Sequence, residues 1–125
     1  MLNQTEKQSL SPEEIIARAR KLWLTYLTVT QELLKFINKQ EIDTFLSLVP
    51  QRSELILKLE ELPSHDYRKM DEFKAIAEKI KPMDREIMYK ARAWLNKSRR
   101  QNSVVRSYDL GGAMMNRSVA FNRTY

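Results

Sequence analysis

An apolar repeat in alternating steps of four and three residues runs through the first third of the chain, and it constrains the fold more than any other feature. The repeat comprises Ile15, Ala19, Leu22, Tyr26, Val29, Leu33 and Ile37. This spacing puts apolar side chains on one stripe of an α-helix and is typical of helices that pack on other helices. Ser11 suits the N-cap, Pro12 suits the first helical position and Glu14 completes a capping box. The sequence therefore predicts a helix over residues 12–38, about 40 Å long at ~1.5 Å per residue.

A second helical pattern follows the polar break at residues 38–40 and covers residues 42–62. Pro50 interrupts it, which favours either a kink or a new helix start at that point. Pro63 should end it, because the residue before a proline is disfavoured in the helical conformation.

A third pattern extends from about residue 64 to residue 96. Ser64 or Asp66 can cap its start, and Pro82 predicts a kink near its middle. Beyond Asn96 the apolar pattern gives way to a basic, polar run. Residues 104–108 leave room for a short fourth helix, which Gly111 would end.

The chain is thus expected to be all-α, an antiparallel up-down-up bundle of three long helices with a flexible tail. Its 42% hydrophobic and 30% charged residues suit a folded domain, and two glycines are too few for a turn-rich β-sheet protein. The predicted organisation is a disordered polar leader at 1–10, a helical domain at 11–107 and a basic, aromatic tail at 108–125.

Catalytic chemistry has little support in the sequence. Cysteine is absent, which excludes thiol catalysis and thiolate metal sites, and His65 is the one histidine. No Gly-rich phosphate loop or hydrolase motif occurs. The sequence predicts a non-enzymatic protein without metal or cofactor. The polar start does not resemble a secretory signal, and no apolar stretch is long enough to insert into a membrane, so a cytoplasmic location is expected.

The formal charge of +6 is concentrated at one end of the chain. Residues 85–125 carry nine Lys or Arg against Glu86 and Asp109, a formal charge of +7. This region is therefore the place to expect an acidic partner. Nucleic acid is the less favoured partner, because no nucleic-acid-binding motif is present and the first half of the chain is neutral to acidic.

Arg52 and Asp84 are charged residues at apolar positions. Arg52 lies between Val49 and Ile56 on the stripe of the second predicted helix, and Asp84 flanks the stripe of the third, four residues after Ile80. In one interpretation each side chain reaches solvent from the edge of the stripe. In the other, two antiparallel helices bring them together as a partly buried structural ion pair that sets helix register.

Several short segments resemble one known family. They are IDTFL at 42–46, QRSELI at 51–56, IKPMDREI at 80–87, SYDLG at 107–111 and FNR at 121–123. Together with the long first helix, they are similar to the FliT-type, and more loosely the FlgN-type, flagellar export chaperones. Pro50 and Pro82 depart from the uninterrupted helices of that family.

The resemblance implies a protein that binds the C-terminal helical segment of a filament-cap or hook-associated protein, prevents its premature assembly and delivers it to the export gate and export ATPase. By the same resemblance, Tyr108 would dock at the gate. Two further hypotheses come from the residues themselves: the basic tail would cover the groove when no client is bound, and Phe121 is a further anchor in that tail. The candidate groove residues are Phe45, Leu48, Leu55, Met83, Ile87 and Met88.

Other interpretations stay open. The six groove candidates could instead form the core of the monomer or the seam of a homodimer. The chain as a whole could be a basic helical nucleic-acid-binding or regulatory protein, or a structural coiled-coil oligomer.

Overall fold

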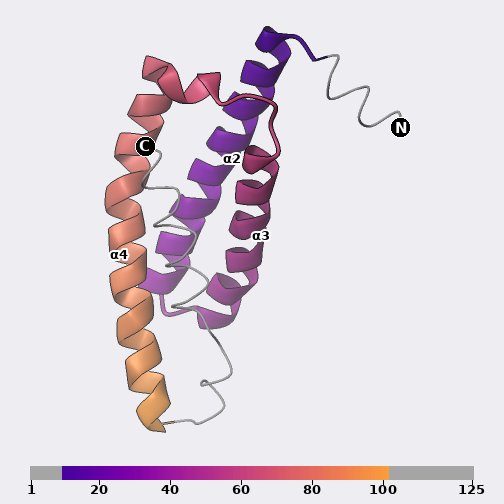
Figure 1. Cartoon of the computed structure of the whole chain (residues 1–125). Helices are drawn as coiled ribbons and strands as arrows, with labels where there is room; N and C mark the ends of the chain where they lie inside the picture. Colours follow the sequence, from indigo (N-terminus) through magenta and orange to yellow (C-terminus); the bar gives the residue numbers. More distant parts are fainter. Residues whose placement is uncertain (1–9, 102–125) are drawn as a thin grey trace, which may run out of the picture.

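The computed structural model describes residues 10–101, which form three long helices and one short helical turn (Figure 1). The elements are α2 at Pro12–Asn38, α3 at Ile42–Glu60, the 3-10 turn η1 at Asp66–Lys69 and α4 at Asp71–Gln101. Successive long helices run in opposite directions, so the predicted all-α, up-down-up bundle is confirmed. The predicted short fourth helix, the tail and residues 1–9 of the leader lie outside the described residues.

Helix α2 is the central element of the bundle. It packs against both α3 and α4, whereas within residues 10–101 no Cα atom of α3 lies within 8 Å of one in α4. Figure 1 shows the same arrangement, with α3 and α4 on either side of α2. The two flanking helices are therefore linked by long side chains rather than by close backbones.

The two ends of α2 lie where local sequence chemistry predicts them. At the start, the Ser11 hydroxyl accepts a hydrogen bond from the Glu14 amide at 3.2 Å, and the Glu14 carboxylate accepts one from the Ser11 amide at 3.5 Å. These bonds satisfy amides that the first turn leaves free. At the other end Gln40 adopts φ 59°, a left-handed conformation that reverses the chain into α3 within three residues.

The later helices differ in part from the sequence expectation. Helix α3 continues through Pro50, which excludes the new helix start there and leaves the alternative of a kink. Helix α4 continues through Pro82, where a kink stays a prediction. The third helix is not capped by Ser64 or Asp66, because residues 66–69 form a separate 3-10 turn and Met70 is extended before α4 begins. Helix α4 runs on to residue 101, where its basic C-terminal end is compatible with the helix dipole.

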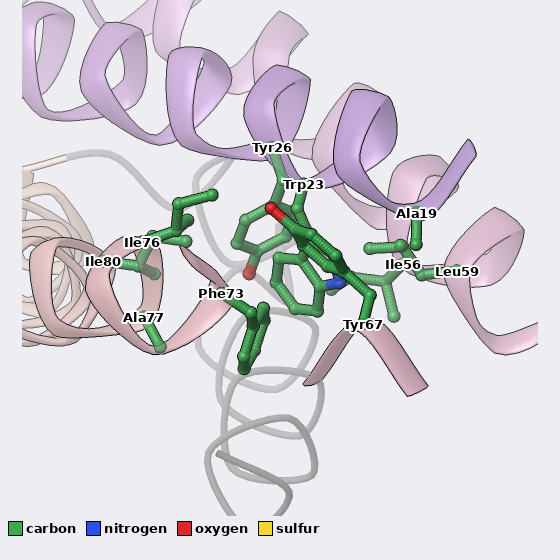
Figure 2. Close-up of a cluster of buried hydrophobic side chains, with 10 residues drawn as sticks. All are labelled: Ala19, Trp23, Tyr26, Ile56, Leu59, Tyr67, Phe73, Ile76, Ala77 and Ile80. Carbon is green, nitrogen blue, oxygen red and sulfur yellow. The ribbon is translucent and has the colours of Figure 1, made fainter. Parts of the chain in front are cut away.

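An aromatic cluster fills the core at the end of the bundle near η1 (Figure 2). The Trp23 ring meets the Phe73 ring edge to face, with centroids 4.8 Å apart, and Tyr67 contacts Phe73 at 5.9 Å. Such pairs are favourable beyond the area they bury. The short turn η1 places Tyr67, only 1% exposed, in this cluster.

The hydroxyl of Tyr67 leads to a prediction at alkaline pH. This hydroxyl donates a hydrogen bond to Glu72 at 2.7 Å. The pKa of Tyr67 is raised from its ordinary 10.0 to about 12, mainly because the hydroxyl is buried and secondly because of this hydrogen bond. The unfolded chain loses this proton at lower pH than the folded chain does. The stabilisation is therefore fully present below pH ~10 and should be lost as the pH rises toward the folded pKa. Urea denaturation between pH ~10 and ~12 should show a fall in the free energy of unfolding of the wild type and a smaller fall in Tyr67→Phe. Identical pH profiles of the two proteins would contradict this role of the Tyr67 hydroxyl.

A second, aliphatic cluster fills the other end of the bundle. Its buried members are Leu33, Ile37, Phe45, Ile87 and Ala91. A wide rim of partly buried apolar side chains surrounds them: Val29, Leu34, Phe36, Ile42, Leu46, Leu48, Val49 and Trp94. Partly buried apolar side chains from all three long helices therefore surround this cluster.

Candidate functional site

A polar layer separates the two core clusters, and each long helix contributes one residue to it. These residues are Thr30 of α2, Arg52 of α3 and Asp84 of α4, all buried. The Arg52 Nη1 atom lies 2.6 Å from Asp84 Oδ1 and donates to Thr30 Oγ1 at 3.1 Å. Thr30 in turn donates to the Tyr26 carbonyl at 2.8 Å, and the guanidinium lies 4.7 Å from the centre of the Tyr26 ring.

The structure thus brings Arg52 and Asp84 together, in the second of the two arrangements that the sequence left open. Their side chains are only 7% and 2% exposed. Burial raises the pKa of Asp84, and the neighbouring Arg52 opposes that rise. A pair so deeply buried cannot touch a partner, and such pairs contribute specificity of packing more than stability. The pair links α3 to α4, whose Cα atoms do not come within 8 Å of each other in the described residues.

The six groove candidates do not form one surface. Phe45 and Ile87 are 0% exposed in the aliphatic cluster, so in this structure they are core residues rather than groove residues. Each lies in the middle of its helix's buried stripe, which points toward the other two helices. The remaining four, Leu48, Leu55, Met83 and Met88, are partly buried. Tyr108 and Phe121 lie outside the described residues.

The sides of α4 can be assigned from its polar contacts with α2. Glu72 pairs with Arg20 at 2.7 Å, and Lys90 hydrogen-bonds to Asn38. Helical periodicity puts Met83 on this same side, facing α2. Met88 lies across the buried stripe from Met83 and therefore faces away from α2, on the side toward α3.

The sides of α3 follow in the same way. Leu55 packs against the aromatic cluster, and Leu62, in the bend beyond α3, lines a small hollow with Ala19 and Trp23 of α2. We therefore assign Leu48 and Leu55, which are seven residues apart on one row of α3, to the α2 side. The opposite row begins at Ile42, which shares a cleft with Trp94 and Lys90 of α4. This row continues along the α4 side through Leu46, Val49 and Leu57.

These assignments define an elongated open face, made of Ile42, Leu46, Val49 and Leu57 of α3 and Met88 of α4. Four of the five are partly buried and Leu57 is 43% exposed. At the α2–α3 turn, the face adjoins a cleft of about 340 Å³. The described residues lining this cleft are Ile37, Asn38, Gln40, Ile42, Lys90, Ala93, Trp94 and Lys97.

Of the five residues of this face, only Met88 is among the six groove candidates predicted from the sequence. A signal for the others was present, because α3 carries apolar residues around more than half of its circumference, wider than one helix partner requires. Periodicity alone could not say which flank of α3 would face α2 and which would face α4.

Comparisons of the chain with protein-family models, curated proteins and solved structures find no match. Within the described residues, no helix is long and apolar enough to cross a membrane. In residues 10–101 there is also no group of three or more His, Asp or Glu side chains that could hold a metal ion.

Proposed function

We propose that this protein is a flagellar type III export chaperone that holds the C-terminal helical segment of a filament-cap or hook-associated protein. In this proposal it acts in the cytoplasm without catalysis, keeps its client unassembled and passes it to the export gate and ATPase. The identity of the client rests on the sequence resemblance. The observation that carries the binding mode is the open face between α3 and α4.

The open face has the properties that a helix-binding surface needs. Helices α3 and α4 contribute its side chains, both pack against α2, and its apolar side chains follow the length of α3. An amphipathic helix laid along it would cover these side chains, as in other helix-in-groove complexes. Fully burying one exposed leucine contributes about 1.5–3 kcal/mol, so a few such contacts support specific binding.

Two leucines of nearly equal exposure provide a matched test. Leu57 is 43% exposed on the open face, whereas Leu24 is 46% exposed on the outer side of α2. Leu57→Ser should weaken binding of the cap protein's C-terminal segment about tenfold or more, since one buried leucine is lost. Leu24→Ser should leave the affinity unchanged. Isothermal titration of both variants with that segment measures the difference, and equal affinities would remove the open face from the proposal.

The same measurement separates the proposal from a structural coiled-coil oligomer. A chaperone should bind the segment in a fixed stoichiometry, while an oligomer would use the open face for a second copy of itself. Sedimentation of the chain alone and with the segment distinguishes the two outcomes. Self-association that Leu57→Ser abolishes, together with no uptake of the segment, would favour the oligomer.

A further inference from the structure

The cleft at the α2–α3 turn combines apolar and basic side chains. Ile37 of α2, Ile42 of α3 and the partly buried Trp94 of α4 give it apolar walls. Lys90 and Lys97 also line it, and none of the described residues that line it carries a carboxylate. Its volume of about 340 Å³ lies at the lower end of the range for ligand sites, which suits a group as small as one large amino-acid residue.

The two lysines of this cleft differ in their contacts within the chain. Lys90 pairs with Glu86 at 2.9 Å and hydrogen-bonds to Asn38, so its charge is already compensated by the fold. Lys97 is exposed and forms no ion pair with a carboxylate of residues 10–101. The uncompensated positive charge of the cleft is therefore that of Lys97.

Gln40 also lines the cleft, in a backbone conformation that favours a different residue. Helix α2 ends in a Schellman motif, in which the Gln40 amide donates to the Ile37 carbonyl at 3.2 Å and the Glu41 amide to the Phe36 carbonyl at 3.0 Å. The motif holds Gln40 at φ 59°, where glycine is usual because it has no Cβ atom. Glycine would close the same turn with less strain. A role for the side-chain amide in the cleft explains the glutamine.

We propose that this cleft binds the C-terminal residue of the partner helix, an apolar residue with a free α-carboxylate. The apolar walls receive its side chain, and Lys97 and the Gln40 amide donate hydrogen bonds to its carboxylate. Ile42 belongs to both the cleft and the open face, so a helix lying on the face brings one of its ends to the cleft. Charge selects the C-terminal end, because an N-terminal amine would meet two lysines.

The direction of the partner helix follows from this contact. Helix α3 begins at Ile42, so a partner helix that ends there runs antiparallel to α3. Glu41 and Asp43 adjoin Ile42 in the chain, so the positive charge is local and suits one carboxylate rather than a row of phosphates. This inference rests on the function proposed above and specifies the end group and direction of its partner.

Three designed helical peptides with one apolar face test the inference. The first ends in phenylalanine with a free carboxylate, the second in phenylalanine amide, and the third is the first extended by four Gly and Ser residues, which moves the carboxylate away. Fluorescence anisotropy measures their dissociation constants for the full chain. The free-acid peptide should bind about tenfold more tightly than the other two, and high salt should reduce the difference. Equal binding of all three would overturn the inference and leave the open face standing, whereas both proposals fail if none binds.

Substitutions in the chain locate the carboxylate. Lys97→Gln should reduce the preference for the free acid about fivefold. Lys79→Gln removes the same charge at an exposed position on the same side of α4, about five turns earlier, and should leave the preference unchanged. Lys97 also suits the end of α4, but a role in the helix dipole alone would alter stability and not this preference.

Gln40→Gly separates backbone strain from binding. It should raise the urea midpoint, because glycine relieves the left-handed turn, and yet weaken binding of the free-acid peptide. If Gln40→Gly and Lys97→Gln both keep the wild-type preference for the free acid, the cleft does not hold the carboxylate and the inference is wrong.

Two further measurements address other occupants of the cleft. N-acetyl-phenylalanine carries the same ring and carboxylate without the helix and should bind about a hundredfold more weakly than the free-acid peptide, since it makes none of the contacts along the open face. Comparable affinity would make the cleft a small-molecule site and overturn the inference. Sedimentation of the chain alone tests for a second copy, and a dimer that Lys97→Gln abolishes would likewise overturn it.

Discussion

Replacing Asp84 with leucine is expected to lower the free energy of unfolding by about 3–5 kcal/mol, because it leaves the buried Arg52 guanidinium without the carboxylate that neutralises it. Arg52→Met should also destabilise the chain. The double variant Arg52→Met/Asp84→Leu should return to within about 1 kcal/mol of the wild type or exceed it, since apolar side chains can fill the same layer. Urea denaturation of the four proteins measures the coupling directly.

The exposed pair Lys69–Asp66 is the matched control for this cycle. Its side chains are 83% and 54% exposed, and Lys69→Met should cost less than about 1 kcal/mol. A similarly small effect of Asp84→Leu would mean that Arg52 reaches water in solution.

The single variant Arg52→Met also has an expected pH dependence. Burial raises the pKa of Asp84, and removing Arg52 removes the opposing influence, so that pKa rises further. The folded state then holds the Asp84 proton more strongly than the unfolded state does. The variant should therefore be more stable at acidic pH and lose stability as the pH rises through the folded pKa of Asp84.

The second large effect concerns Phe45, where the sequence and the structure assign different roles. Phe45 is fully buried, so Phe45→Ala should lower the free energy of unfolding by about 3–5 kcal/mol. Its neighbour Leu46 lies on the open face and is only partly buried, so Leu46→Ala should cost about 1 kcal/mol and should mainly weaken client binding. Urea denaturation and titration with the cap segment, performed on both variants, separate the two roles. A Phe45→Ala variant that keeps its stability but loses the client would restore Phe45 to the binding surface.

Where local chemistry is decisive, the sequence predicted the fold well. The capping box at Ser11 and the break at residues 38–40 determine both ends of α2. The spacing of Arg52 and Asp84 made their pairing one of two open alternatives, because antiparallel helices place such positions opposite each other. The start of α4 was not predicted, because no local sequence signal marks it. Tyr67 and Phe73 fit one continuous apolar stripe, yet a 3-10 turn and an extended Met70 separate them.

The candidate site was predicted less well. A helical stripe has two flanks, and only the handed arrangement of three helices decides which flank of α3 faces α2 and which faces the open side. Leu48 and Leu55 are therefore predicted to lie in the groove, whereas helical periodicity puts Leu46 and Val49 on the row of α3 that begins at Ile42, beside the cleft shared with α4. Phe45 and Ile87 were assigned to it because an apolar position in a sequence does not reveal whether it belongs to the core or to its rim.

The most direct test of the open face is an NMR titration of the methyl-labelled chain with the cap protein's C-terminal segment. The proposal predicts that the methyl signals of Leu46, Val49 and Met88 shift as the segment binds, while those of Leu48, Leu55 and Met83 stay in place. Shifts confined to the second set, or no shifts at all, would contradict the proposal that the face between α3 and α4 holds a partner helix.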